Sequence, residues 1–168
     1  MFTKGVTASA AAVLVGSVLL AGCGGSSGGS TTDGSTTKVV VKTDSGLTKA
    51  ELIKEGDAIC EETDKTQEVG LKAYLKENPK GQSNEAEQAK MVLAVGLPPI
   101  QEEVEDLAEL GSPPGDEEIV EAILAGIEKA IEEGEKNPTS LLGEENNPFS
   151  AVSKLAAEYG FKECNTAL

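Results

Sequence analysis

Three cysteines are the residues of this 168-residue chain best suited to chemistry. They are Cys23, Cys60 and Cys164, and no two of them form a CxxC motif. The chain has no histidine, arginine or tryptophan. It therefore lacks the commonest general base, the commonest transition-metal ligand and the usual bidentate clamp for phosphate. These absences disfavour an enzyme, and the sequence yields no catalytic residue, no metal ligand and no cofactor.

The first cysteine, Cys23, directly follows Leu20-Ala21-Gly22 at the end of a short apolar segment. Lys4 precedes that segment, whose length suits a secretory signal peptide and is short for a membrane-spanning helix. The motif resembles the lipobox of bacterial lipoprotein signal peptides. The resemblance implies cleavage between Gly22 and Cys23, and lipidation of the Cys23 thiol with acyl chains such as palmitate, which anchor a protein stably when two are present. The expected location is the extracytoplasmic face of the cell membrane. A retained membrane anchor is the alternative, which the glycines after Cys23 disfavour.

The net charge of the chain is −15, and removal of a signal peptide containing Lys4 would make it −16. Nucleic acids and anionic lipid surfaces are bound by clustered lysine and arginine, so this charge argues against both partners. The expected partners are the membrane, through lipid on Cys23, and an unidentified envelope protein or small ligand.

Lipidation of Cys23 would leave Cys60 and Cys164 as a pair in an oxidising compartment, where disulfides persist. We therefore expect a Cys60–Cys164 disulfide. A redox-active or metal-binding pair is the alternative, which the spacing and the lack of histidine disfavour.

The composition divides the chain into three parts. Residues 1–22 form the signal peptide, and residues 23–46 form a tether rich in glycine, serine and threonine. Residues 47–168 form one domain, which we expect to be all-α, a four- to five-helix bundle with one disulfide.

The first helix is predicted over residues 48–77. Thr48 and Glu51 form a capping-box pattern, and Asn78-Pro79 ends the helix. Residues 61–68 are polar, so the helix is expected to fray or break there.

The remaining helices are predicted from breakers and caps. A stretch from Asn84 is interrupted by Pro98-Pro99, which implies a kink or two separate helices. Asp116 is expected to cap the next helix with its side chain. Asn137-Pro138 and Asn147-Pro148 resemble helix starts, and the last helix, over residues 149–159, would end at Gly160 with Phe161 folded back.

Three segments of this domain are LTKAELIKEGDAIC (47–60), PPGDEEIVEAILAGIEKA (113–130) and AAEYGFKECN (156–165). They resemble small, tethered, helical lipoproteins of Gram-positive bacteria, over nearly the whole folded part. The resemblance implies a compact helical domain on a cytoplasmic membrane, with one cysteine in the first helix and another after the YGF turn. That group has no established function, so it assigns no binding or catalytic residue.

Several motifs allow both a structural and a functional interpretation. The acidic clusters 102–106 and 132–135 suit a solvated helix face better than a calcium site, because they lack the loop and glycine of an EF-hand. Gly56, Gly70 and Gly126 favour close helix packing over a ligand groove. Tyr159-Gly160-Phe161 favours a buried cap over an exposed recognition tip.

The leading hypothesis is a non-enzymatic interaction or structural module of the cell envelope, which an exposed apolar patch without a cavity would favour. A solute-binding lipoprotein would need an apolar pocket between helices. A buried carboxylate pair with a shifted pKa would favour the third hypothesis, an enzyme.

Overall fold

The computed structural model describes residues 46–143 and 145–164, and all regular structure in these ranges is helical. In chain order the elements are α1 (Lys49–Glu77), α2 (Glu85–Met91), a π-helical segment (Val92–Gly96), α3 (Leu97–Leu110), α4 (Glu117–Lys136), a 3₁₀ helix (Pro138–Leu142) and α5 (Ser150–Tyr159). The predicted all-α fold is confirmed, with four helices if α2 and α3 are counted as one continuous stretch and five if they are separate. The predicted signal peptide, its cleavage site at Gly22-Cys23 and the tether, apart from Gly46, lie outside the described residues.

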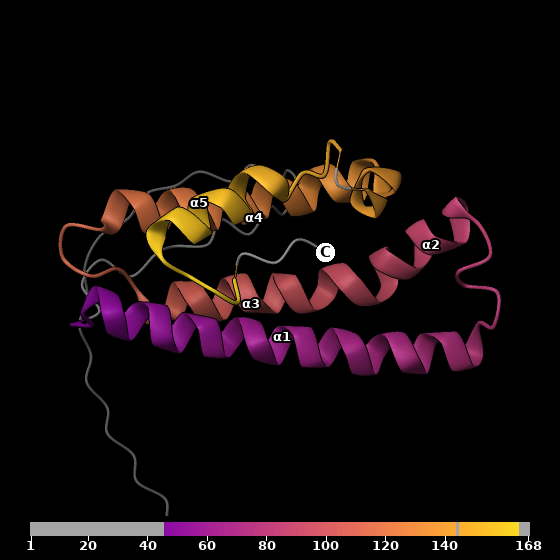
Figure 1. Ribbon diagram of the computed structural model, residues 1–168, viewed down its shortest axis with the longest axis horizontal. Helices are drawn as coiled ribbons and strands as arrows, with labels where there is room; N and C mark the ends of the chain where they lie inside the picture. The colour runs from indigo at the N-terminus through magenta and orange to yellow at the C-terminus, as the bar shows by residue number, and fades with distance from the viewer. Residues whose placement is uncertain (1–45, 144, 165–168) are drawn as a thin grey trace, which may run out of the picture. The chain divides into compact units, whose positions relative to one another are not determined.

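The helices of the domain lie in three layers (Figure 1). The long helix α1 runs antiparallel to the α2–α3 stretch and packs on α3. α3 also packs on α4, and α4 packs on α5. The 3₁₀ helix contacts α2 and so closes the far end of the domain. α3 is therefore covered on both sides.

The predicted capping box starts α1. The backbone N–H of Thr48 donates to the Glu51 carboxylate at 2.9 Å, and the Glu51 N–H donates to the Thr48 hydroxyl at 3.3 Å. The prediction that the helix frays or breaks over residues 61–68 is wrong, because α1 is continuous to Glu77. Ion pairs between residues four apart, such as Lys65–Glu61 at 2.9 Å, support this stretch only weakly. Packing against α3 supplies the rest.

The prolines of the second stretch are accommodated by a change in helix type. Residues 92–96 form a π-helical segment, and the N–H of Leu97 donates to the carbonyl of Val92. Pro98 and Pro99 then occupy the first turn of α3, where a missing N–H costs little. The helical path continues through the prolines, as the kinked alternative implied.

Asp116 lies at the start of α4, but the prediction that its side chain caps the helix is wrong. Its carboxylate makes no capping hydrogen bond and instead accepts one from the Tyr159 hydroxyl at 2.8 Å. Burial, reinforced by this hydrogen bond, raises the pKa of Tyr159. Lys49 lies 4.0 Å from the centre of the same ring. A contact across 43 residues has therefore replaced a local one.

The two predicted helix starts have different outcomes. Asn137 occupies the N-cap position of the 3₁₀ helix, and Pro138 is its first residue. The prediction is wrong for Asn147-Pro148, because α5 begins at Ser150 with Phe149 at its N-cap position, and Asn147 accepts a hydrogen bond from the Phe149 N–H at 2.9 Å. After α5, Gly160 has a φ of +126°, and Phe161 turns back into the core, where it is buried. The buried-cap interpretation of this turn is confirmed over an exposed tip.

Two of the three glycines singled out in the sequence mark close packing. A Cβ atom on Gly56 would lie 2.6 Å from the Phe161 ring, and one on Gly126 would lie 2.9 Å from Val152. At Gly70 the nearest atom would be 3.5 Å away, an ordinary contact that an alanine could make. The close-packing prediction therefore holds for Gly56 and Gly126 and is wrong for Gly70.

Candidate functional site

The predicted disulfide joins Cys60 of α1 to Cys164, with 5.1 Å between their Cα atoms. Cys60 is buried, and Cys164 is partly buried. The bond ties the last described turn of the chain to the middle of the first helix. The pair is thus a covalent cross-link, as expected, and not the metal-binding pair weighed against it.

Three α1 residues within about one helical turn contact that last turn. Gly56 leaves the space that the Phe161 ring fills. The Asp57 carboxylate accepts hydrogen bonds from the backbone N–H groups of Lys162 and Glu163, at 2.9 and 3.0 Å. Cys60 then closes the contact through the disulfide. The turn is held by packing, by charge-assisted hydrogen bonds and by a covalent bond.

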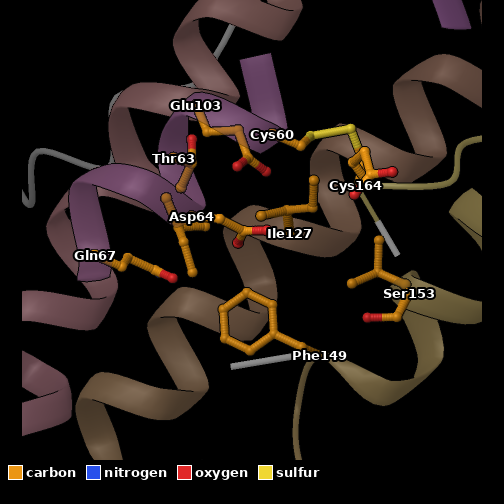
Figure 2. A pocket seen from close by; sticks show the side chains of 12 residues that line it. Cys60, Thr63, Asp64, Gln67, Glu103, Ile127, Phe149, Ser153 and Cys164 are labelled. Carbon is orange, nitrogen blue, oxygen red and sulfur yellow. A yellow bond between two sulfur atoms is a disulfide. The ribbon is translucent and has the colours of Figure 1, made fainter. Parts of the chain in front are cut away.

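Next to the disulfide lies a hollow of about 90 Å³ that we call the carboxyl pocket. Its lining comes from α1, α3, α4, the segment around α5 and the last turn: Cys60, Thr63, Asp64, Gln67, Ile100, Glu103, Ile127, Phe149, Val152, Ser153, Glu163 and Cys164. Figure 2 shows Thr63, Asp64, Gln67 and Glu103 along one side, with Phe149 and Ser153 across from them. The lining includes three carboxylates and no lysine.

Glu103 is the most perturbed carboxyl group among the described residues. Burial is the main cause that raises its pKa to about 7, and the negative charge of Asp64 adds to the effect, while a hydrogen bond with Thr63 opposes it. Partial burial also raises the pKa of Asp64. None of the ion pairs in the described part of the chain involves Glu103. Near neutral pH this group is therefore divided between its charged and neutral forms.

A second, more open hollow of about 440 Å³ runs between α1 and α3, and we call it the α1–α3 groove. Its floor includes Ala58, Ile59, Pro99 and Leu110. Its other lining residues are Glu55, Glu62, Thr63, Thr66, Glu102, Glu103 and Asp106, so five carboxylates and no lysine line it. Glu103 and Thr63 belong to both hollows and form a wall common to them.

The two acidic clusters singled out in the sequence have different environments. Three members of the first, Glu102, Glu103 and Asp106, line the groove. Members of the second lie on α4, where Glu132 and Glu133 pair with lysines at 3.4 and 3.7 Å. No group of three or more potential metal ligands converges within residues 46–143 and 145–164. The second cluster is the solvated face that was expected, and the first borders a hollow.

The sequence missed the carboxyl pocket, although it held a signal of it. Residues 61–68 break the apolar stripe of α1, and this break predicted fraying. In the structure Thr63, Asp64 and Gln67 from that stretch line the pocket. The Gln67 amide also donates to the carbonyl of Gly96, in the π-helical segment, at 2.9 Å. The break in the apolar stripe therefore indicated polar residues of an intact helix that line a polar hollow.

The apolar core has little space for a ligand. The hollow lined by Leu52, Leu107, Val120, Ile123, Leu124, Ile127, Phe161 and Cys164 has a volume of only about 10 Å³. That is about the minimum needed to hold one water molecule. The only large hydrophobic residue that is strongly exposed in the described part of the chain is Val69, at 67%. This small core hollow is thus no apolar ligand pocket, and no exposed apolar patch is formed by the large hydrophobic residues of the described ranges.

In the part of the chain that the structure describes, no helix is both long and apolar enough to cross a membrane. Comparison of the chain with protein-family models, with curated proteins and with solved structures found no significant match.

Proposed function

We propose that this protein is a lipoprotein held at the extracytoplasmic face of the cell membrane by lipid on Cys23, and that its helical domain is a non-enzymatic interaction module. The lipobox-like motif and the tether support the anchor. The Cys60–Cys164 disulfide supports an oxidising compartment. The likeness to small helical lipoproteins of Gram-positive bacteria agrees with both points.

The observation that carries the proposed binding role is the charge of the α1–α3 groove. Five carboxylates line it, and among the residues that the structure describes only Glu55 and Glu62 form ion pairs with lysines, at 2.8 and 4.0 Å. The net charge of −15 adds a long-range attraction for cations. We infer that the partner is a basic segment of another envelope protein, because charge complementarity sets specificity and association rate.

The groove has dimensions that suit such a segment. Its α1 side extends from Glu55 to Thr66 and its α3 side from Pro99 to Leu110. At about 1.5 Å per helical residue, each side is about 16 Å long. An extended peptide advances about 3.3 Å per residue, so about five residues fit along the groove.

Binding of pentalysine to the mature protein in a non-ionic detergent tests this role. The triple variant Glu62→Gln, Glu102→Gln and Asp106→Asn should weaken binding about tenfold, which corresponds to about 1.4 kcal/mol spread over three exposed pairs. The control is Glu118→Gln, Glu121→Gln and Glu158→Gln, which removes the same charge from exposed positions on α4 and α5. Equal losses in the two triple variants would mean that only net charge matters, and the groove assignment would be wrong.

The anchor has its own test. Replacing Cys23 by alanine removes the acceptor thiol, so the protein should leave the membrane fraction. A protein that stays bound to membranes after a high-salt wash would contradict lipid anchoring through Cys23.

An enzyme is the second candidate, because the Glu103 and Asp64 pair has the raised pKa values that acid–base catalysis uses. The binding role is preferred, since five carboxylates and no lysine line the groove. A hydrolytic activity abolished by Glu103→Gln would reverse this preference.

A further inference from the structure

The carboxyl pocket has a lining suited to one kind of ligand group. Its charged side chains are Asp64, Glu103 and Glu163, and its hydroxyls are those of Thr63 and Ser153. All three charges are negative, and hydroxyl and carboxylate oxygens accept hydrogen bonds. A cation with several N–H donors would satisfy this lining better than an anion or a neutral solute would.

The apolar part of the lining and the volume narrow the choice further. Ile100, Ile127, Phe149 and Val152 complete the wall and match a hydrocarbon stem. At about 10–15 Å³ for one water molecule, the hollow of about 90 Å³ holds several. A lysine presents a compact ammonium on a flexible hydrocarbon stem, and both parts suit this lining.

The electrostatics of Glu103 also favour a cation over an anion as the ligand. Burial and the Asp64 charge disfavour its ionised form, and no cation pairs with it in the described part of the chain. An ammonium in the pocket would reverse this balance and favour ionisation. In the pocket, the other titratable groups facing Glu103 are Asp64 of α1 and Glu163 of the last turn, while α4, α5 and Phe149 contribute none to the lining. On its groove side, Glu103 shares the lining with the carboxylates of Glu55 and Glu62 of α1 and of Glu102 and Asp106 of α3.

We propose that the carboxyl pocket binds a primary ammonium group, that of a lysine side chain from the basic segment in the α1–α3 groove. The inference rests on the proposed function, because the groove and the pocket share the wall formed by Glu103 and Thr63. Lysine carries its ammonium on a flexible four-carbon stem, which would let a segment in the groove place that group beside Glu103.

Proton release accompanies this binding. Because the pKa of Glu103 is about 7 in the empty pocket, the carboxyl group must lose its proton at pH 6 before it can pair with the ammonium. The affinity should therefore be about tenfold lower at pH 6 than at pH 8. The ligand stays fully charged over this range, so the pH effect reports on the protein.

The test uses n-butylammonium and pentalysine as probes of the mature protein in a non-ionic detergent, with binding followed by NMR at Phe149 and Ser153. Replacing Glu103 by glutamine should weaken n-butylammonium binding at least tenfold at pH 8 and abolish its pH dependence. Glu109→Gln is the matched control, because Glu109 is exposed on α3 and lines neither hollow, and it should bind as the unmodified protein does.

The two probes separate failure of the pocket from failure of the groove. If pentalysine binds but n-butylammonium has the same affinity or the same pH profile in the Glu103→Gln variant, the pocket assignment is overturned and the groove remains. If neither probe binds, both the pocket and the proposed binding role are overturned.

Discussion

Glu103 should lower the stability of the empty domain at neutral and higher pH, and Glu103→Gln should remove that cost. In the folded protein the pKa of Glu103 is about 7, against an ordinary value of 4.5. Below pH 4.5 the carboxyl group is protonated in the folded and unfolded states and has no net effect. Between pH 4.5 and 7 the folded state holds more protons than the unfolded state, so stability falls as the pH rises. Above pH 7 the full cost is present.

The size of the effect follows from the same two values. Each unit of difference in pKa corresponds to about 1.4 kcal/mol, so the difference between 4.5 and about 7 corresponds to about 3 kcal/mol. Water reaches part of the Glu103 side chain and screens its charge, so we expect about 2 kcal/mol. A glutamine has nearly the same shape and no charge to desolvate. The variant should therefore be about 2 kcal/mol more stable at pH 8 and equal to the parent near pH 4.

Urea unfolding of both proteins from pH 4 to pH 8, with the disulfide intact, measures this difference. Glu109→Gln serves as the control for removing one negative charge from α3. A constant difference between Glu103→Gln and the parent across the whole range would refute the reasoning, because the cost would not then come from ionisation. A stabilised variant that no longer binds ammonium would show that the chain gives up stability for binding at this residue.

Three further substitutions test the packing around the site. Cys164→Ser should lower the free energy of unfolding by about 2–4 kcal/mol, since the disulfide closes a loop of about 100 residues. Urea unfolding of the variant and of the oxidised parent measures this loss, and an unchanged midpoint of the urea transition would contradict the prediction. Gly56→Ala should cost about 1–3 kcal/mol, because its Cβ would lie 2.6 Å from the Phe161 ring. Gly70→Ala should instead stabilise by up to about 1 kcal/mol, because its Cβ would make only a 3.5 Å contact with Val95 and alanine favours the helix. Thermal unfolding compares the last two variants, and shifts of the same sign would be inconsistent with the packing described.

Features that depend only on neighbouring residues could be predicted from the sequence. Thr48 and Glu51 are three residues apart, and their capping box needs only the first turn of a helix. The turn at Gly160 and the helix start after Asn137 are equally local. The Cys60–Cys164 disulfide could also be predicted by counting cysteines, because two cysteines of a chain in an oxidising compartment usually form a disulfide.

The tertiary structure alone decided which distant side chains meet. Asp116 was expected to cap its own helix, but packing of α5 on α4 gives it the Tyr159 hydroxyl instead. Asp64 and Glu103 are ordinary acidic residues in the sequence, and they interact only because α1 and α3 pack side by side. Desolvation depends on the atoms that exclude water from every direction, and most of these atoms come from elsewhere in the chain. For that reason the carboxyl pocket and the raised pKa of Glu103 emerge only from the packed helices.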